Sequence, residues 1–142
     1  MGSLFDGIGG FPLAAVQNGI EPVWASEIEA FPIQVTAVRF PAMRHMGDIT
    51  QLKGAELPPV DIITGGSPCQ DLSLAGKRAG LAGERSGLFM GQIRVIKEMR
   101  RADEERQRIN GATEPVRPRF MVWENVPGAF SSADGEDFRA VL

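Results

Sequence analysis

The hydrophobic and polar positions of the chain follow two alternating periods. Short apolar, often β-branched runs bounded by glycine or proline predict strands at 3–5, 21–27, 60–66 and 119–126. Between them, apolar residues recur at helical spacing, and they predict a first helix through Leu13, Val16 and Ile20, then helices at 30–40 and 88–108. Strands that alternate with helices predict an α/β domain with a mostly parallel sheet.

Prolines and glycines mark the ends of these elements. Pro12 and Pro32 fall near the first turns of the first two helices, where the missing N–H costs no helical hydrogen bond. Gly19 is expected to end the first helix. In the long helix, the side chains expected to point inward are Leu88, Ile93, Ile96 and Met99. The glycine- and charge-rich stretch 77–87 predicts a loop, and 136–142 predicts the start of a further helix.

Composition favours one globular domain. The chain has 142 residues and 43% hydrophobic residues, which are ordinary values for a single core. Its single cysteine cannot form an internal disulfide. We find no apolar run of about 18 residues that would predict a membrane span, and no basic-then-apolar N-terminus typical of a signal peptide. We therefore expect a cytoplasmic protein that does not interact with membranes.

The charges are unevenly distributed. The net charge of −3 does not by itself indicate a nucleic-acid-binding protein. However, residues 76–108 carry nine basic and five acidic side chains, whereas residues 1–75 carry three basic and eight acidic ones. The basic cluster is either a solvated helix face or a surface for phosphate groups.

The stretch "FDGIGGF" at 5–11 is a glycine-rich turn from strand to helix, where backbone N–H groups can approach a ligand. It is not a dinucleotide fingerprint, because Pro12 stands where a third glycine or alanine is needed. Glu27 follows the next strand and could accept hydrogen bonds from both hydroxyls of a ribose. The two features suggest an adenosine-containing ligand without a pyrophosphate, although Glu27 could also be a solvated carboxylate.

Two further stretches carry candidate chemistry. Asp48 could accept from an adenine amino group while Ile49 packs on the ring, or Asp48 could simply stabilise a turn. Cys69 follows Pro68 in "GGSPCQ" and is either an exposed, reactive thiol or a buried, inert one. His45 has no obvious catalytic context, so a Cys–His hydrolase remains an alternative with little support.

Glu124 ends the last predicted strand, which we expect to lie beside the strand that leads to Cys69. A carboxyl group and a thiol would then face one pocket. A protonated Glu124 could donate a hydrogen bond to a ring nitrogen there.

Five stretches in order, "FDGIGGF", "SEIE", "GDIT", "GGSPCQDLS" and "ENVPG", resemble motifs of the DNA (cytosine-5)-methyltransferases, enzymes that use S-adenosylmethionine. The resemblance covers essentially the whole chain. It implies a Rossmann-like methyltransferase fold, a mostly parallel sheet with flanking helices, incomplete at the C-terminus. It also implies transfer of a methyl group to C5 of a cytosine flipped out of double-stranded DNA, in a restriction-modification, phage or orphan setting.

The resemblance assigns roles to individual residues. The implied S-adenosylmethionine pocket consists of Phe5, Gly7, Gly9, Glu27, Ile28, Asp48, Ile49 and Leu88. Cys69, preceded by Pro68, would be the nucleophile that adds to C6, and Glu124 would hold the target base. The residues expected to contact DNA are Gln70, Ser73, Lys77, Arg78 and Arg85. No metal site is implied.

The family pattern also includes a later arginine motif, a target-recognition region and a final helix that packs beside the first motif. None of these is found in residues 1–142. We therefore expect these residues to form the N-terminal portion of a cytosine-5 methyltransferase catalytic domain. It would associate with a complementary C-terminal chain or with itself. The alternative is an inactive remnant that binds S-adenosylmethionine or a partner.

Overall fold

The computed structural model describes residues 1–68 and 86–128. Most of the loop predicted at 77–87 and the helix predicted at 136–142 lie outside the described residues, and so does Cys69. The strands are β1 (Gly2–Leu4), β2 (Trp24–Ser26), β3 (Arg44–His45), β4 (Ile62–Gly65) and β5 (Phe120–Trp123). The helices are α1 (Gly10–Gln17), α2 (Ala30–Arg39), α3 (Ser86–Asn110) and the 3₁₀ turn η1 (Gly54–Glu56).

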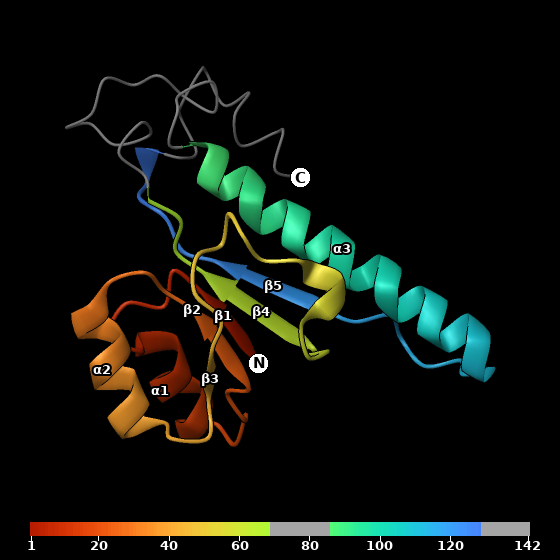
Figure 1. The fold of residues 1–142 in the computed structure, drawn as a ribbon, viewed down its shortest axis with the longest axis horizontal. Coiled ribbons are helices and arrows are strands. Elements are labelled where there is room, and N and C mark those ends of the chain that lie inside the picture. The colour runs from red at the N-terminus through yellow and green to blue at the C-terminus, as the bar shows by residue number, and fades with distance from the viewer. Residues whose placement is uncertain (69–85, 129–142) are drawn as a thin grey trace.

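The five strands form one sheet in the order β3-β2-β1-β4-β5, and every neighbouring pair is parallel. Figure 1 shows α1 and α2 on one side of this sheet and α3 with η1 on the other. The predicted α/β class with a mostly parallel sheet is confirmed. The sequence patterns did not reveal β3 or η1.

The two faces of the sheet are packed differently. The α3 side holds the larger core, which contains the buried side chains of Leu4, Trp24, Ile49, Leu52, Leu57, Val60, Ile63, Val95 and Met99. On the α1 and α2 side, the buried apolar cluster consists of Ala25, Phe40 and Met43 with Leu13 packed against it. Most of the buried apolar side chains of the described part therefore lie on the α3 side of the sheet, where the β3–β4 connection contributes Ile49, Leu52, Leu57 and Val60.

The first helix ends as the sequence predicted. Gly19 adopts a φ of +71° directly after the C-cap Asn18. Its N–H donates to the Val16 carbonyl, and the N–H of Ile20 donates to the Ala15 carbonyl. These two bonds are those of a Schellman motif, which satisfies carbonyl groups that a helix end would leave unpaired.

The inward face of α3 differs from the prediction. The described α3 side chains that are at most 3% exposed are those of Phe89, Gln92, Val95, Met99 and Asp103. Of the four side chains predicted to point inward, only Met99 is in this set. Leu88 and Ile96 are partly buried against the core, and Ile93 lines a groove along the outer side of the helix. Two polar side chains, Gln92 and Asp103, occupy the buried face of α3, and the spacing of apolar residues could not predict this.

The hydrogen bonds of the Asp103 carboxylate explain why this charged group is buried. Its carboxylate accepts from the backbone N–H of Arg117 at 2.9 Å and from the Arg117 guanidinium at 3.1 Å. Arg106 and Gln107 donate to the same carboxylate at 3.3 and 3.0 Å. These bonds tie the C-terminal half of α3 to the segment that enters β5.

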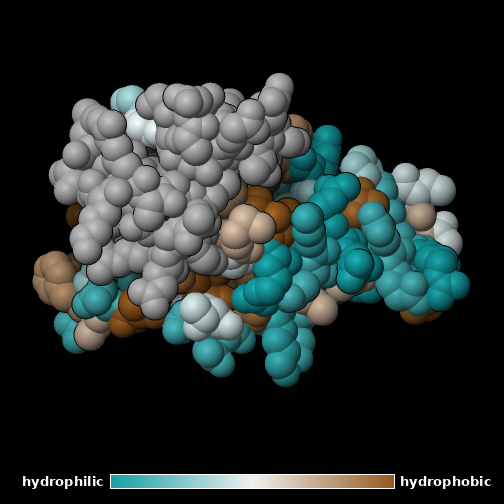
Figure 2. All heavy atoms as spheres, turned by 90° about the horizontal axis from the view of Figure 1, so that it is seen from above, coloured by the Kyte–Doolittle hydropathy of each residue, from teal (hydrophilic) through white to brown (hydrophobic). Residues whose placement is uncertain are grey.

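The outer surface beside that half of α3 is mainly hydrophilic in the view of Figure 2. Among the described residues, no helix combines the length and the apolar character needed to cross a membrane.

Candidate functional site

The carboxyl ends of the parallel strands meet at one edge of the sheet, where ligands bind in α/β proteins. A cavity of about 280 Å³ opens there. It is lined by Phe5, Ser26, Glu27, Ile28, Glu29, Asp48, Ile49, Pro68 and Leu88. Six of the eight residues predicted to bind the cofactor thus line one cavity, together with the predicted catalytic Pro68.

Backbone donors fix the carboxylate of Glu27. Oε2 accepts from the N–H of Gly7 at 2.8 Å, and Oε1 accepts from the N–H groups of Ile28 and Glu29 at 2.7 and 3.0 Å. Gly7 lies in the glycine-rich turn after β1, so this carboxylate joins the ends of β1 and β2. A preorganised acceptor of this kind suits a ligand hydroxyl.

The two glycines predicted to bind the cofactor do not line the cavity. Gly7 contributes through its N–H bond to Glu27. Gly9 is the N-cap of α1 with a φ of +86°, and a Cβ there would lie 2.8 Å from atoms of both Thr36 and Phe40. The structure therefore requires glycine at position 9 for the turn and for helix packing.

Asp48 and Ile49 form the opposite wall. Oδ1 of Asp48 accepts from the N–H of Thr50 at 2.8 Å, so Asp48 stabilises a local turn and also lines the cavity. Ile49 is 4% exposed and belongs to the larger core. The two sequence interpretations of Asp48, ligand contact and turn residue, are therefore compatible.

A second cavity, of about 490 Å³, lies on the side of the sheet edge that carries Glu124. Its lining consists of Phe5, Asp6, Ile8, Gly10, Phe11, Ala14, Gly66 and Glu124. The N–H of Glu124 donates to the Gly65 carbonyl at 3.1 Å, which places the residue at the end of the β4–β5 pair. Phe5 lines both cavities, so the two cavities meet at this residue.

Phe5 has an unusual backbone. Its φ is +53°, and it is the one non-glycine residue with a positive φ in the described ranges 1–68 and 86–128. For a bulky residue this conformation costs free energy, and such strain is concentrated at functional sites. The turn therefore places Phe5 where the two cavities meet, at the expense of some local stability.

Asp6 is a buried carboxyl group beside this turn. It is 5% exposed, and its Oδ1 accepts from Oγ of Ser3 at 2.6 Å. Oδ2 has no hydrogen-bond partner among the described residues. Burial raises the pKa of Asp6, the nearby charge of Glu27 raises it further, and the Ser3 hydrogen bond opposes both. The sequence patterns did not single out Asp6 as a site residue.

Sequence reasoning also missed Ser26 as part of the cofactor-side cavity. Ser26 is the last residue of β2, and its Oγ donates to the Gly47 carbonyl at 2.6 Å. Its position at a strand end was the available signal.

In the described part of the chain, no three His, Cys, Asp or Glu side chains are grouped so as to hold a metal ion.

The predicted nucleophile Cys69 and the predicted DNA contacts Gln70, Ser73, Lys77, Arg78 and Arg85 lie outside the described residues. The described chain leads directly to them. Oγ of Ser67 accepts from Nε1 of Trp123 at 3.2 Å, and Pro68 forms part of the cofactor-side cavity. The tilted ring contact between Phe89 and Trp123, with centroids 4.8 Å apart, supports this turn from α3.

Comparisons with known proteins point to one family. A family model described as C-5 cytosine-specific DNA methylase matches residues 1–142. The chain is 36% identical over 138 residues to the Type II methyltransferase M.HhaI of Haemophilus parahaemolyticus, covering 97% of the chain and 37% of that relative. It is 34% identical over 140 residues to M1.ScrFI of Lactococcus lactis subsp. cremoris, covering 98% and 31%.

A relative from Escherichia phage P1, named a DNA N-6-adenine-methyltransferase, is 36% identical over 137 residues, but the match covers only 17% of its length. Among solved structures, one described as a DNA modification methyltransferase encoded within a prophage of E. coli superposes with a TM-score of 0.66 at 28% identity. That match covers 99% of the chain and 36% of the solved chain. The chain therefore spans between 17% and 37% of the length of these four proteins.

Proposed function

Because the chain belongs to the C-5 cytosine-specific DNA methylase family, we propose that it forms the cofactor- and cytosine-binding part of a DNA (cytosine-5)-methyltransferase. The enzyme would transfer a methyl group from S-adenosylmethionine to C5 of a flipped-out cytosine in double-stranded DNA. The observation that carries the proposal is the pair of cavities that share Phe5, one lined by Glu27 and Asp48 and the other by Glu124.

The donors and acceptors of the smaller cavity fit an adenosine group. Glu27 is held by three N–H groups and would accept from the ribose hydroxyls. Asp48 would accept from the adenine amino group, and the apolar side chains of Ile28, Ile49 and Leu88 would enclose the rings. When bound, S-adenosylmethionine supplies an electrophilic methyl group on a sulfonium.

The remaining chemistry belongs to side chains of this chain. C5 of cytosine is a weak nucleophile, and the thiolate of Cys69 would activate it by forming a bond to C6. Glu124 would donate to N3, where negative charge would otherwise develop. C5 would then take the methyl group, a base such as water would remove the C5 proton, and the C6–sulfur bond would break to release Cys69 as thiolate.

The name of the phage P1 relative raises adenine as another target. The match covers only 17% of that relative, so the activity in its name need not reside in the matched part. Addition of a thiolate to C6 is chemistry for a pyrimidine, and the sequence pairs Cys69 with Glu124 as this chemistry requires. Cytosine is therefore the proposed base.

The proposal can be tested with DNA that contains 5-fluorocytosine. Fluorine at C5 cannot leave as a cation, so the bond between Cys69 and C6 should persist after methyl transfer. We expect a denaturant-stable adduct when the chain is mixed with S-adenosylmethionine, this DNA and the C-terminal part of a relative supplied as a second polypeptide. The adduct should be absent in Cys69→Ala.

The second candidate function is a binding module that has lost methyl transfer. It predicts saturable binding of S-adenosylhomocysteine in calorimetry but no adduct on 5-fluorocytosine DNA, even with the second polypeptide present. The assignment as a methyltransferase part would then be wrong for this chain.

A further inference from the structure

The wall formed by Asp48 and Ile49 is carried by an unusual connection. The crossovers from β1 to β2 and from β2 to β3 contain the helices α1 and α2, whereas the crossover from β3 to β4 contains only the three-residue turn η1. Local turn bonds close this segment: the N–H of Gln51 donates to the Asp48 carbonyl at 3.0 Å, and the N–H of Leu52 donates to the Ile49 carbonyl at 3.3 Å. No helix packs the segment as a unit, so bonds from α3 add to these turns in fixing its direction.

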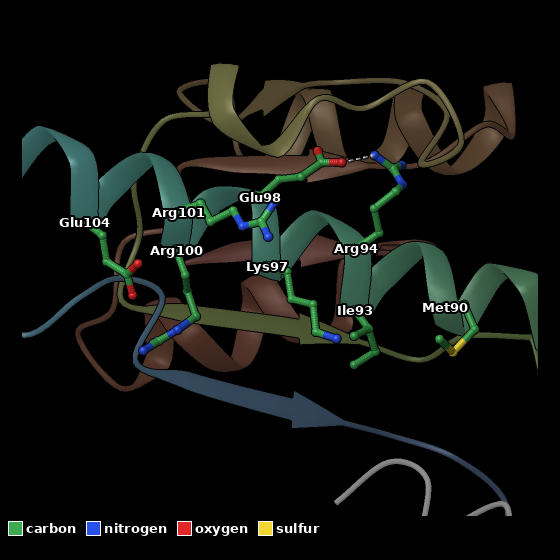
Figure 3. A pocket seen from close by; sticks show the side chains of 8 residues that line it. All are labelled: Met90, Ile93, Arg94, Lys97, Glu98, Arg100, Arg101 and Glu104. Carbon is green, nitrogen blue, oxygen red and sulfur yellow. Dashed lines mark hydrogen bonds and ion pairs between the residues drawn. The ribbon is translucent and has the colours of Figure 1, made fainter.

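Arg94 on α3 adds two bonds to this segment. Its Nη2 donates to the Ile49 carbonyl at 2.8 Å, and its Nη1 donates to the Leu52 carbonyl at 2.7 Å. The same guanidinium pairs with Oε1 of Glu98 at 3.0 Å. In Figure 3, Arg94 and Glu98 extend from α3 toward the same side, away from Ile93 and Lys97.

Glu98 extends the contact by one further bond. Its Oε2 accepts from the N–H of Gly54 at 2.7 Å. Burial acts to raise the pKa of Glu98, but the hydrogen bonds from Gly54 and Arg94 together lower it, so the carboxylate is held in its charged form. A Cβ at Gly54 would overlap the backbone oxygen of Val95, so this turn and α3 are in direct backbone contact.

We propose that Arg94 is a positioning residue for the predicted adenine end of the cofactor cavity. With Glu98, it fixes the direction of the segment from Ile49 to Gly54, and hence the places of Asp48 and Ile49 in the wall. The inference rests on the proposed function, since it assumes that an adenosine group occupies this cavity. Arg94 is absent from the lining of the cavity and would act only through the backbone it holds.

Arginine is specifically suited to this role. One guanidinium binds two carbonyl oxygens and one carboxylate in a planar array, which the single ammonium group of lysine cannot reproduce. The apolar side chains of Ile49 and Leu52 already anchor the segment in the core. Loss of the guanidinium should therefore loosen the backbone of this wall without unfolding the domain.

The test compares Arg94→Lys with Arg108→Lys, a matched control on the same helix. Within residues 1–68 and 86–128, Arg108 pairs with Glu105 alone, on an exposed surface. Binding of S-adenosylhomocysteine and of 5′-methylthioadenosine is measured by calorimetry. Hydrogen–deuterium exchange is followed across the chain without ligand.

In Arg94→Lys we expect hydrogen–deuterium exchange in residues 49–57 to become about tenfold faster, which corresponds to a loss of roughly 1.4 kcal/mol of local stability. Exchange in strands β1 and β4 should be unchanged. Both ligands should lose the same affinity factor, also about tenfold, because both carry adenosine. Arg108→Lys should leave exchange and affinity as in the natural chain.

Unchanged exchange in residues 49–57, or unchanged affinity for both ligands, would overturn the role of Arg94. A natural chain that binds neither ligand, combined with faster exchange in Arg94→Lys, would reject the proposed cofactor site and leave the positioning of the segment by Arg94 supported.

Discussion

The backbone N–H of Gly7 donates to Oε2 of Glu27 across 2.8 Å, and this bond joins the turn after β1 to the end of β2. The same carboxylate accepts two more backbone N–H groups through Oε1. Bonds among the described residues occupy one of the two lone pairs on Oε2, and the other can accept from a ligand hydroxyl. Glu27 both organises the glycine-rich turn and presents a charged acceptor to the cavity.

The first prediction concerns this carboxylate. Glu27→Ala removes a charged acceptor whose hydrogen bond to a ligand is worth about 1.5–3 kcal/mol. We expect the affinity for S-adenosylhomocysteine, measured by calorimetry, to fall by roughly 10- to 100-fold. Glu56→Ala is the control, because Glu56 is exposed and, in the part of the chain that the structure describes, its side chain pairs with Lys53 alone. Equal affinities in Glu27→Ala and the natural chain would exclude Glu27 from the binding site.

The second prediction concerns Asp103. Asp103→Asn leaves the Arg117 guanidinium and backbone N–H without their charged acceptor, and it should lower the free energy of unfolding at neutral pH by about 2–4 kcal/mol. Glu105→Gln, which alters an exposed pair on the same helix, should change it by less than about 1 kcal/mol. Urea unfolding of both variants provides the measurement.

The pH dependence of this difference has a defined sign. Burial acts to raise the pKa of Asp103, but hydrogen bonds from the backbone and side chain of Arg117 and from Arg106 lower it below its ordinary value of 3.8. A lowered folded-state pKa gives stability that is present above the unfolded-state value and is lost as the pH falls through the folded-state value. The gap between the natural chain and Asp103→Asn should thus be full at pH 7 and shrink below about pH 3.8. A gap that grows on acidification would contradict this account.

The third prediction concerns Gln92. This residue is fully buried, and neither atom of its side-chain amide has a hydrogen-bond partner among the described residues. Gln92→Met keeps a similar volume and removes the unpaired groups, so it should raise the free energy of unfolding by about 1–3 kcal/mol. Gln51→Met at an exposed position serves as the control. A clear loss of stability in Gln92→Met would instead indicate that the amide is paired, for example with an internal water molecule.

The sequence predicted most residues of the cofactor-side cavity by two routes. Glu27 follows a recognisable strand, and a parallel sheet brings its end to the same edge as the turn "FDGIGGF". Asp48 follows β3, which the sequence did not predict, and the roles of Phe5, Ile28 and Leu88 were implied by the family resemblance alone. Gly9 does not line this cavity, and the sequence motif did not reveal that Thr36 of α2 packs against it.

Other features depend on partners far away in the chain. β3 has only two residues, one of them charged, so it carries no apolar alternation that a sequence pattern could reveal. Asp103 is buried because of Arg117, 14 positions later, and a helical period cannot predict such a bond. Arg94 likewise binds carbonyl groups 42 and 45 positions earlier. Tertiary hydrogen bonds, rather than local propensity, decided these positions.

The fourth prediction separates the two cavities at Gly66. A Cβ at this position would lie 2.8 Å from Oε2 of Glu124, the end of a movable side chain, and Gly66 does not have a positive φ. Gly66→Ala should therefore fold normally and displace the Glu124 carboxylate. We expect affinity for S-adenosylhomocysteine to stay within about twofold, whereas covalent trapping on 5-fluorocytosine DNA with the second polypeptide should fall at least about tenfold. Gly91→Ala is the control, since its Cβ would make only an ordinary contact with Ile49 at 3.9 Å. Normal trapping by Gly66→Ala would mean that Glu124 does not need its present position to hold the base, and a matching loss of cofactor affinity would mean that the two cavities are not independent.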